Sequence, residues 1–471
     1  MQIKEYLKRK KFFWDQIADK KITRFSKFYK DTIIKTYKFL IPEENRILEI
    51  GSGNGDLLAA LKPSHGVGID VSENMVRLAK EKHPNINFYQ MDAENFNLDK
   101  NKFDYIILSD VVNELWDLQK VLEKIKPNCT SRTRIIFNYF SHLWKQPLQA
   151  GSFFHLNTLS DNLNWFTTND IKNLLNLTGY SSVKSFSEIV LPINIPFISS
   201  VLNRFLSKIP PFSWLSLTNF LIAKPDEFHQ NLDKTVSVVI AARNEKGNID
   251  ELLKRIPVLG KGTEVIFVEG HSTDGTYEKI LESIEKFKNF DCKVFKQEGE
   301  GKGDAVRFGF EKSKGEILMI LDADMTVEPE ELKRFYEIII SGKGEFVNGV
   351  RLIYPYQDQA MRFANLIGNK FFAMAFTWLL GQPIKDTLCG TKVLLAEDYK
   401  KISKNRNYFG DFDPFGDFDL LFGAAKLNLK IVELPIRYKA RKYGTTNISR
   451  WRHGFLLLQM VIFAARRIKF Y

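Results

Sequence analysis

The sequence predicts an α/β protein with two doubly wound domains, each built on a parallel sheet. The chain has 471 residues, enough for two or three domains with separate cores. Its hydrophobic fraction of 44 % is ordinary for a globular protein and argues against disorder. Short apolar strands alternate with helical segments from Arg46 to about Phe140, and the alternation restarts at Val236.

The first half follows this alternation after an N-terminal stretch, residues 1–45, whose apolar spacing is helical. The expected strands are residues 46–50, 66–70, 87–90, 103–109, 134–138 and 217–223. The expected helices are residues 55–61, 73–83 and 118–125. Strands that alternate with helices form a parallel sheet with helices on both faces.

The second half begins after a polar linker, which we place at residues 225–234 between domains 1–224 and 235–471. Its expected strands are residues 236–241, 264–268, 293–296 and 317–321. Its expected helices are residues 248–255, 277–287 and 304–313. The halves share an architecture but not their motifs, so they are not internal repeats.

Positive charge is concentrated near the C-terminal end. The net charge is +12, and residues 426–471 carry eleven Lys or Arg against Glu433 alone, which gives +10. Such a segment favours an anionic membrane surface, a phosphorylated ligand or a nucleic acid. We disfavour nucleic acid, because the motifs gather at strand ends rather than as exposed aromatics interleaved with basic residues.

The sequence predicts a cytoplasmic protein, peripheral to the membrane face. Three distant cysteines show neither metal-ligand spacing nor a disulfide framework, and no apolar run reaches about 18 residues. The apolar stretch 454–465 is flanked by cations and suits an anionic leaflet, although burial as a core helix is the alternative.

A glycine-rich turn, Glu49–Gly55, separates the first strand of the first domain from its helix. Glycines there let the backbone approach a ligand closely. Asp70 ends the next strand, 19 residues after Gly51, where an acid reaches ribose hydroxyls. Asp92 and Asp110 end two further strands, so all four strand ends are expected to face one ligand site.

Between Leu48 and Leu115 these motifs resemble the class I S-adenosylmethionine-dependent methyltransferases, which have a Rossmann-like fold. The resemblance implies S-adenosylmethionine as the cofactor, held by Glu49, Gly51, Gly53, Gly55, Asp70, Asp92 and Ala93. Another nucleotide or a purely structural turn is the alternative. For a hydroxyl acceptor, His142 and His155 are candidate bases, although lone histidines are more often structural.

In the second domain, Asp322-Ala323-Asp324 follows an apolar strand. Two carboxylates at one strand end offer hard oxygen ligands, which suit Mg²⁺ or Mn²⁺. Such a metal holds a diphosphate and stabilises it as a leaving group. The pattern alone is weakly diagnostic, because turns are rich in aspartate.

The surrounding residues, from Thr235 to about His453, resemble the family 2 glycosyltransferases, especially the dolichyl- or polyprenyl-phosphate mannosyltransferases. The resemblance implies a GT-A fold and a metal bound by Asp322 and Asp324. It also implies a nucleotide-sugar site formed by Ala242, Arg243, Glu245, Glu269, Asp274, Lys302 and Asp322. Asp386, in a segment that lies beside donor sugar and acceptor in that family, is a candidate catalytic residue.

The resemblance also implies inverting transfer, and the acceptor decides which residues are needed. A hydroxyl of a glycan needs a base, for which Asp417 and Asp419 are the candidates. A polyprenyl phosphate is already anionic and needs cations, which Arg351, Arg441 and Lys442 supply.

Together the two resemblances imply a bifunctional enzyme that transfers a sugar and methylates a related small molecule or glycan. The alternative is an active glycosyltransferase whose first domain only binds a nucleoside or serves as a scaffold.

Overall fold

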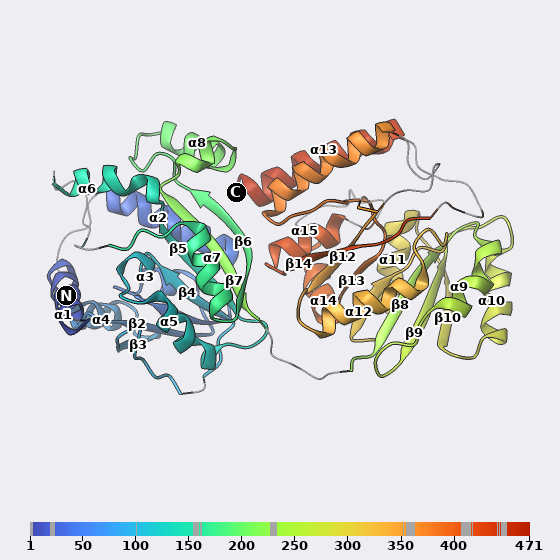
Figure 1. Ribbon diagram of the computed structural model, residues 1–471, viewed down its shortest axis with the longest axis horizontal. Helices are drawn as coiled ribbons and strands as arrows, with labels where there is room; N and C mark the ends of the chain where they lie inside the picture. Colours follow the sequence, from blue (N-terminus) through green and yellow to red (C-terminus); the bar gives the residue numbers. More distant parts are fainter. Residues whose placement is uncertain are drawn as a thin grey trace. The chain divides into compact units, whose positions relative to one another are not determined.

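The computed structural model describes residues 3–18, 24–99, 101–153, 160, 163–226, 233–351, 353–354, 363–406, 416, 418–439, 441, 443 and 450–471. The chain forms two compact units, each with its own sheet (Figure 1). The first unit comprises Met1–Phe228 with Phe470–Tyr471, and the second comprises His229–Lys469.

The first unit contains a seven-stranded sheet in the order β3-β2-β1-β4-β5-β7-β6. Its strands are β1 (Arg46–Ile50), β2 (His65–Asp70), β3 (Asn87–Gln90), β4 (Tyr105–Ser109), β5 (Arg134–Phe140), β6 (Tyr180–Glu188) and β7 (Thr218–Pro225). Strands β1 to β5 pair in parallel, whereas β7 runs antiparallel to both β5 and β6. The predicted parallel sheet is confirmed for β1 to β5, whereas the predicted last strand, β7, runs antiparallel and β6 was not predicted.

The helices of the first unit are α1 (Ile3–Ala18), α2 (Arg24–Leu40), α3 (Asp56–Ala60), α4 (Glu73–Lys82), α5 (Leu118–Ile125), α6 (Lys145–Phe153), α7 (Thr168–Leu177) and α8 (Ile198–Phe205). Alternate strand residues face opposite sides of the sheet. Leu48 therefore packs in one apolar cluster with α5 and α7, while Ile47 packs in another with α2 and α4. Helices on both faces were predicted and are confirmed.

The second unit contains a mixed sheet in the order β10-β9-β8-β11-β13-β12-β14. Its strands are β8 (Val236–Ala242), β9 (Thr263–Glu269), β10 (Asp291–Lys296), β11 (Ile317–Ile320), β12 (Phe346–Val350), β13 (Lys392–Leu395) and β14 (Ile431–Pro435). Its helices are α9 (Ile249–Arg255), α10 (Thr276–Lys286), α11 (Gly301–Lys312), α12 (Leu332–Ile340), α13 (Phe363–Leu380), α14 (Ala396–Lys404), α15 (Phe418–Lys426) and α16 (Arg450–Ala464). Among these described strands, β13 alone runs antiparallel to both of its neighbours, so the sheet predicted as parallel is mixed.

The strand order reverses between β1 and β4 in the first sheet, and between β8 and β11 in the second. Ligands of open α/β sheets bind beyond the carboxyl ends of the strands at such reversals. Both sequence motifs therefore fall where each sheet favours a ligand. None of the helices in the described ranges combines the length and apolarity needed to cross a bilayer.

Candidate functional sites

The loop after β1 requires glycine. Gly51, Gly53 and Gly55 have φ angles of 72°, 49° and 74°, in the left-handed region that other residues rarely adopt. Space is also restricted: a Cβ on Gly51 would lie 2.7 Å from Val111 Cγ2, and one on Gly55 would lie 2.5 Å from Phe88 Cζ. The loop can therefore present its backbone, rather than side chains, to a ligand.

Asp70, at the end of β2, is tied to this loop. Its Oδ2 accepts a hydrogen bond from the Gly53 backbone N–H at 2.8 Å, and its Oδ1 accepts one from Ser72 N–H at 2.9 Å. Burial raises the pKa of Asp70, and these two hydrogen bonds oppose the rise. A carboxylate accepts roughly four hydrogen bonds, so Asp70 can hold the loop and still accept from a ribose hydroxyl.

Glu49 lies on β1 directly before the glycine loop, with only 2 % of its surface exposed. Burial raises its pKa well above the ordinary range. Its Oε2 has no hydrogen-bond partner among the described residues. A buried polar atom without a partner costs free energy unless a ligand satisfies it, so Glu49 fits a cofactor with hydrogen-bond donors.

Asp92 and Ala93 follow β3. Asp92 Oδ1 accepts from the Glu94 backbone N–H at 3.1 Å, and its Oδ2 accepts from Asn95 Nδ2 at 2.8 Å. Ala93 is partly buried against the core cluster that includes β1. The two residues thus lie in a stabilised turn beyond β3.

Asp110, after β4, has a φ of +57° and joins a network that the sequence did not predict. Its Oδ1 accepts from the Tyr29 hydroxyl at 2.6 Å and from Asn138 Nδ2 at 2.5 Å. Burial raises the pKa of Asp110 to about 6, although Tyr29, Lys30 and Asn138 oppose the rise. A carboxyl group with such a pKa suits proton transfer near neutral pH.

Helix α1 connects the ends of β2 and β4. Asp15 accepts from the Ser72 hydroxyl at 2.6 Å, while the Tyr6 hydroxyl donates to the Glu114 carbonyl at 2.9 Å. The Tyr6 ring also packs edge-to-face on Trp116, 5.1 Å between centroids. These contacts span about 60 to 110 sequence positions, so the sequence pattern gave no signal for them.

Of the two histidines considered as bases, the structure describes only His142. His142 is exposed in the short turn η3 (His142–Trp144). His155 lies outside the described residues.

In the second unit, three motifs that are distant in sequence meet beside Asp322. Lys302 Nζ lies 2.5 Å from Asp322 Oδ1. A Cβ on Gly390 would meet Asp322 Oδ2 and Lys302 Nζ, so a larger residue there would displace one of these two side chains. Burial alone would raise the pKa of Asp322, but Lys302, Lys392 and Arg351 lower it. Asp322 is therefore an ionised carboxylate among cations.

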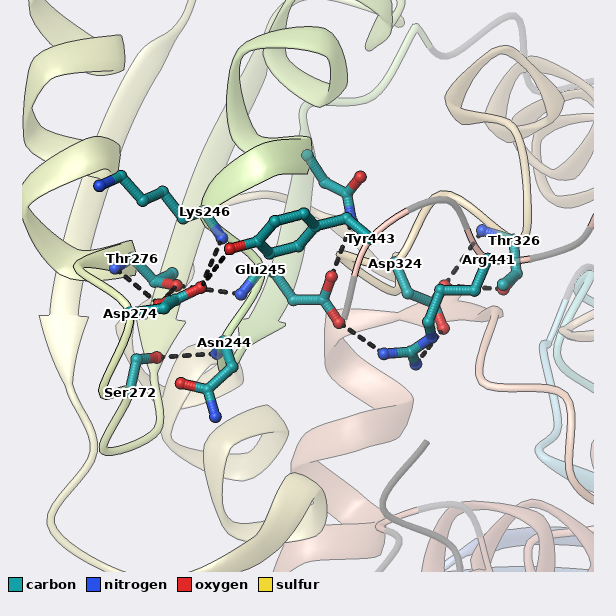
Figure 2. Close-up of polar contacts among 11 residues, drawn as sticks. Asn244, Glu245, Lys246, Ser272, Asp274, Thr276, Asp324, Thr326, Arg441 and Tyr443 are labelled. Carbon is teal, nitrogen blue, oxygen red and sulfur yellow. Dashed lines mark hydrogen bonds and ion pairs between the residues drawn. The ribbon is translucent and has the colours of Figure 1, made fainter. Parts of the chain in front are cut away.

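Arg441 joins Asp324 to Glu245 (Figure 2). Its Nη2 donates to Asp324 Oδ2 at 2.8 Å, and its Nη1 donates to Glu245 Oε1 at 2.9 Å. The other oxygen of Asp324 accepts from the Thr326 hydroxyl at 2.7 Å. Burial raises the pKa of Glu245 to about 7, with Arg441 and Asn248 opposing the rise. One guanidinium thus neutralises two acids at the ends of β8 and β11.

Asp274 holds together the loops that follow β8 and β9 (Figure 2). Its Oδ2 accepts from the Lys246 backbone N–H and from the Tyr443 hydroxyl, each at 3.2 Å. The Asn244 backbone N–H donates to the Ser272 hydroxyl at 3.0 Å. Asp274 thus stabilises the loop pair that the resemblance assigns to nucleotide binding.

The remaining nucleotide-site predictions lie at the same strand ends. The Ala242 carbonyl accepts from Gly270 N–H at 2.9 Å, and buried Glu269 accepts from Ser272 N–H at 2.5 Å. Arg243 is exposed beside them. Glu269 therefore shapes the turn after β9, and Arg243 presents a positive charge to solvent.

Arg351 and Asp386 form a two-pronged ion pair. Arg351 Nε and Nη2 donate to the two carboxylate oxygens of Asp386, each at 2.8 Å, and Arg351 N–H donates to Oδ2 at 3.0 Å. Burial opposes ionisation of Asp386, but Arg351 lowers its pKa. Asp386 thus orients the guanidinium that we predicted as an acceptor clamp.

Asp419 lies at the start of α15, almost fully buried. Its cationic neighbours are Arg406, with Nε 3.3 Å from Oδ2, and Arg307, with Nη1 3.8 Å from the same oxygen. Asp417 and Lys442, also predicted site residues, lie outside the described residues.

Within the described ranges, no three or more His, Cys, Asp or Glu residues are grouped so as to hold a metal ion. Asp322 and Asp324 face Lys302 and Arg441 instead. Their oxygens are nevertheless the donors that Mg²⁺ and Mn²⁺ prefer, and nucleotide sites often combine one or two carboxylates with phosphate oxygens. The pair therefore fits a metal that arrives with a diphosphate.

Comparison with known families agrees with this geometry. Residues 41–179 match the family described as a methyltransferase domain, and residues 237–401 match glycosyl transferase family 2. The chain therefore contains a methyltransferase domain and a family 2 glycosyltransferase domain in these two ranges. The predicted Rossmann-like and GT-A folds are confirmed by these matches together with the two sheets.

Particular relatives match the second domain. A dolichol-phosphate mannosyltransferase of Pyrococcus furiosus is 34 % identical over 220 residues, covering 45 % of this chain and 59 % of the relative. An undecaprenyl-phosphate 4-deoxy-4-formamido-L-arabinose transferase of Pseudomonas aeruginosa is 33 % identical over 131 residues, covering 27 % and 38 % respectively. The chain thus spans less than two thirds of these relatives' lengths.

Among solved structures, a glucosyl-3-phosphoglycerate synthase from Mycobacterium tuberculosis is similar to half of the chain. The identity is 19 %, the TM-score is 0.37, and the match covers 50 % of this chain and 80 % of that one.

Proposed function

We propose that the second domain transfers a sugar from a nucleotide-sugar donor to a polyprenyl phosphate or glycan. We also propose that the first domain transfers a methyl group from S-adenosylmethionine to a related small molecule or glycan. The observation that carries the sugar transfer is the meeting of Lys302, Asp322 and Gly390 beside the ends of β8 and β11. The glycine loop with Asp70 carries the methyl transfer.

In the glycosyltransferase domain, Lys302 supplies positive charge to a diphosphate, and Asp322 with Asp324 would hold Mg²⁺ or Mn²⁺ alongside it. Arg441, predicted to bind the acceptor phosphate, is paired with Asp324. A bound metal would neutralise charge on the departing nucleotide diphosphate. Inverting transfer needs the acceptor oxygen on the opposite face of the anomeric carbon. Arg351, oriented by Asp386, would bind an acceptor phosphate.

A lipid phosphate is the favoured acceptor, for two reasons. The similar proteins carry dolichol phosphate and undecaprenyl phosphate in their names. In addition, residues 426–471 carry a net charge of +10, which favours an anionic surface on which such lipids lie. We therefore propose a peripheral position on the cytoplasmic membrane face. A glycan acceptor would instead require Asp417 or Asp419 as a base.

In the methyltransferase domain, the backbone of Gly51–Gly55 would lie against the methionine part of the cofactor, and Asp70 would accept from its ribose. S-adenosylmethionine supplies an electrophilic methyl group when it is bound. Asp110 is placed to accept the proton of a hydroxyl acceptor, because Tyr29 and Asn138 fix its carboxyl group at the end of β4. A non-catalytic first domain is the competing proposal.

The test is to incubate the purified protein with candidate sugar nucleotides, polyprenyl phosphate, a divalent metal and labelled S-adenosylmethionine. We expect a glycosylated lipid and, separately, a methylated product. Asp322→Ala/Asp324→Ala should abolish sugar transfer and leave S-adenosylmethionine affinity unchanged. Asp70→Ala should weaken S-adenosylmethionine binding and leave sugar transfer intact. Binding of the cofactor without any methylated product would favour the scaffold alternative.

A further inference from the structure

The connection between β6 and β7, residues 189–217, carries apolar side chains on its outer surface. We define the β6–β7 apolar face by its exposed members Ile193, Phe197, Ile198, Phe212, Trp214 and Leu215. Phe197 is 82 % exposed and Trp214 is 69 % exposed. Exposed apolar side chains that gather in one short connection indicate a binding surface, whereas scattered single ones are ordinary.

Helix α8, within this connection, has its polarity reversed relative to an ordinary surface helix. Ser199 and Asn203 face inward, 1 % and 8 % exposed, whereas Ile198, Val201 and Phe205 face outward. A surface helix normally buries its apolar stripe and exposes its polar residues. Exposing the apolar stripe favours an apolar environment outside the protein.

Two buried polar residues of the connection, Asn203 and Lys208, have their side-chain partners, whereas buried Ser216 Oγ has no hydrogen-bond partner among the described residues. Asn203 accepts from Leu191 N–H and donates to the Leu191 carbonyl, each at 2.8 Å. Lys208 forms a buried ion pair with Glu188, at the end of β6. These contacts hold the backbone against the sheet while the aromatic side chains project outward.

The charge of the connection indicates which kind of partner this face binds. Residues 189–217 contain no Asp or Glu, and Lys208 is already neutralised by Glu188. Arg204 is exposed, lies 5.8 Å from the Phe205 ring, and donates to the Phe470 carbonyl at 2.9 Å. Segments that lie in the interface of an anionic bilayer typically contain exposed Trp and Phe with nearby cations and few acids. The connection has this composition.

We propose that the β6–β7 apolar face docks the methyltransferase domain on an anionic lipid bilayer, with Phe197 and Trp214 entering the interface. The proposal does not depend on either catalytic activity. It adds a lipid contact in the first domain to the one expected from the basic C-terminal segment of the second.

Vesicle co-sedimentation of the full chain tests this contact without any substrate. We compare vesicles containing phosphatidylglycerol with vesicles of phosphatidylcholine alone. The variant Phe197→Ser/Trp214→Ser should bind the anionic vesicles about tenfold or more weakly, since each aromatic loses its burial in lipid. The matched control Leu177→Ser/Val258→Ser removes side chains that are 68 % and 67 % exposed elsewhere and should bind like the wild type.

The fluorescence of Trp214 shows whether this residue enters lipid, which distinguishes binding through the β6–β7 apolar face from binding through the C-terminal segment. Brominated lipids should quench the wild-type fluorescence more than that of Trp214→Phe. Equal quenching, or unchanged binding by the double variant, would overturn the proposal. Sedimentation velocity without lipid tests the alternative that this face joins two copies of the chain. A wild-type dimer that becomes a monomer in Phe197→Ser/Trp214→Ser would also overturn the proposal. Equal thermal melting of all variants shows that they fold.

Discussion

The Arg441 guanidinium lies 2.8 Å from the Asp324 carboxylate, although the two residues are separated by 117 positions. The same guanidinium reaches Glu245 at 2.9 Å, so one cation serves two acids (Figure 2). A metal at Asp324 would have to share or replace this contact. The ion pair therefore sets the cost of metal binding in the absence of donor.

Arg441→Ala is expected to raise Mn²⁺ affinity in the absence of donor by about tenfold, the change that about 1.4 kcal/mol produces. The reason is that Asp324 loses its competing cation. Isothermal titration with Mn²⁺ measures this directly. Arg334→Ala, which removes a partly exposed ion pair with Glu331, should leave the affinity unchanged. Weaker Mn²⁺ binding by Arg441→Ala would show that Asp324 is not a metal ligand.

Asp110 makes methyl transfer depend on pH. Its pKa is raised to about 6 by burial; Tyr29 and Lys30 on α2 oppose the rise, and Glu114 adds to it. As a base it must be ionised, so the rate should increase with pH through about 6. Asp110→Asn should lower the rate by roughly 10²-fold or more and remove this dependence. If the pH dependence of the methyl-transfer rate is the same in Asp110→Asn and the wild type, Asp110 is not the base.

The same titration affects stability, with a definite sign. The pKa of Asp110 is higher in the folded state than the ordinary 3.8, so the folded protein binds more protons between pH 4 and about 6. Its contribution to the free energy of unfolding is therefore lost as pH rises through that window. Urea denaturation at several pH values should show that the free energy of unfolding decreases less with rising pH in Asp110→Asn than in the wild type. Tyr29→Phe should move the pH range of this decrease to higher pH, because Tyr29 lowers the pKa of Asp110. Tyr89→Phe, at an exposed position of β3, should leave the range unchanged.

The glycine loop offers a test within one turn. Gly53 and Gly55 both have positive φ, but a Cβ has free space at Gly53 and lies 2.5 Å from Phe88 at Gly55. Gly53→Ala should cost about 1–2 kcal/mol of unfolding free energy through backbone strain alone. Gly55→Ala should cost more, because the strain and the clash add. Equal losses in urea denaturation would contradict the tight packing against Phe88.

Local sequence patterns predicted much of the fold, and contacts between distant residues account for what they missed. Residues 46–50 and 118–125 became β1 and α5 with the predicted bounds, because apolar periodicity is a local property. Strand β6 was missed since Tyr180–Glu188 is rich in serine and mostly half-buried, without apolar alternation. Helix α8 reverses the pattern that predicts an inward face.

The sites divide in the same way. Motifs identified Asp70, Asp322 and Asp324 by residue type and position at strand ends, and the sheets place them at those ends. The sequence could not show that Arg441 faces Asp324. It also could not show that Tyr29 reaches Asp110, because a motif specifies a residue but not its partner across the fold.

The Arg351–Asp386 pair gives a last test, which separates a structural from an acceptor-binding role. Both side chains are largely buried, so Asp386→Ala leaves an uncompensated charge and should cost about 3–5 kcal/mol of unfolding free energy. Glu331→Ala, at a partly exposed pair, should cost less than about 1 kcal/mol. Arg351→Met/Asp386→Leu removes both charges and should recover much of the stability. If Arg351 binds the acceptor, this stable double variant should still show a raised KM for polyprenyl phosphate. An unchanged KM would assign the pair to folding alone.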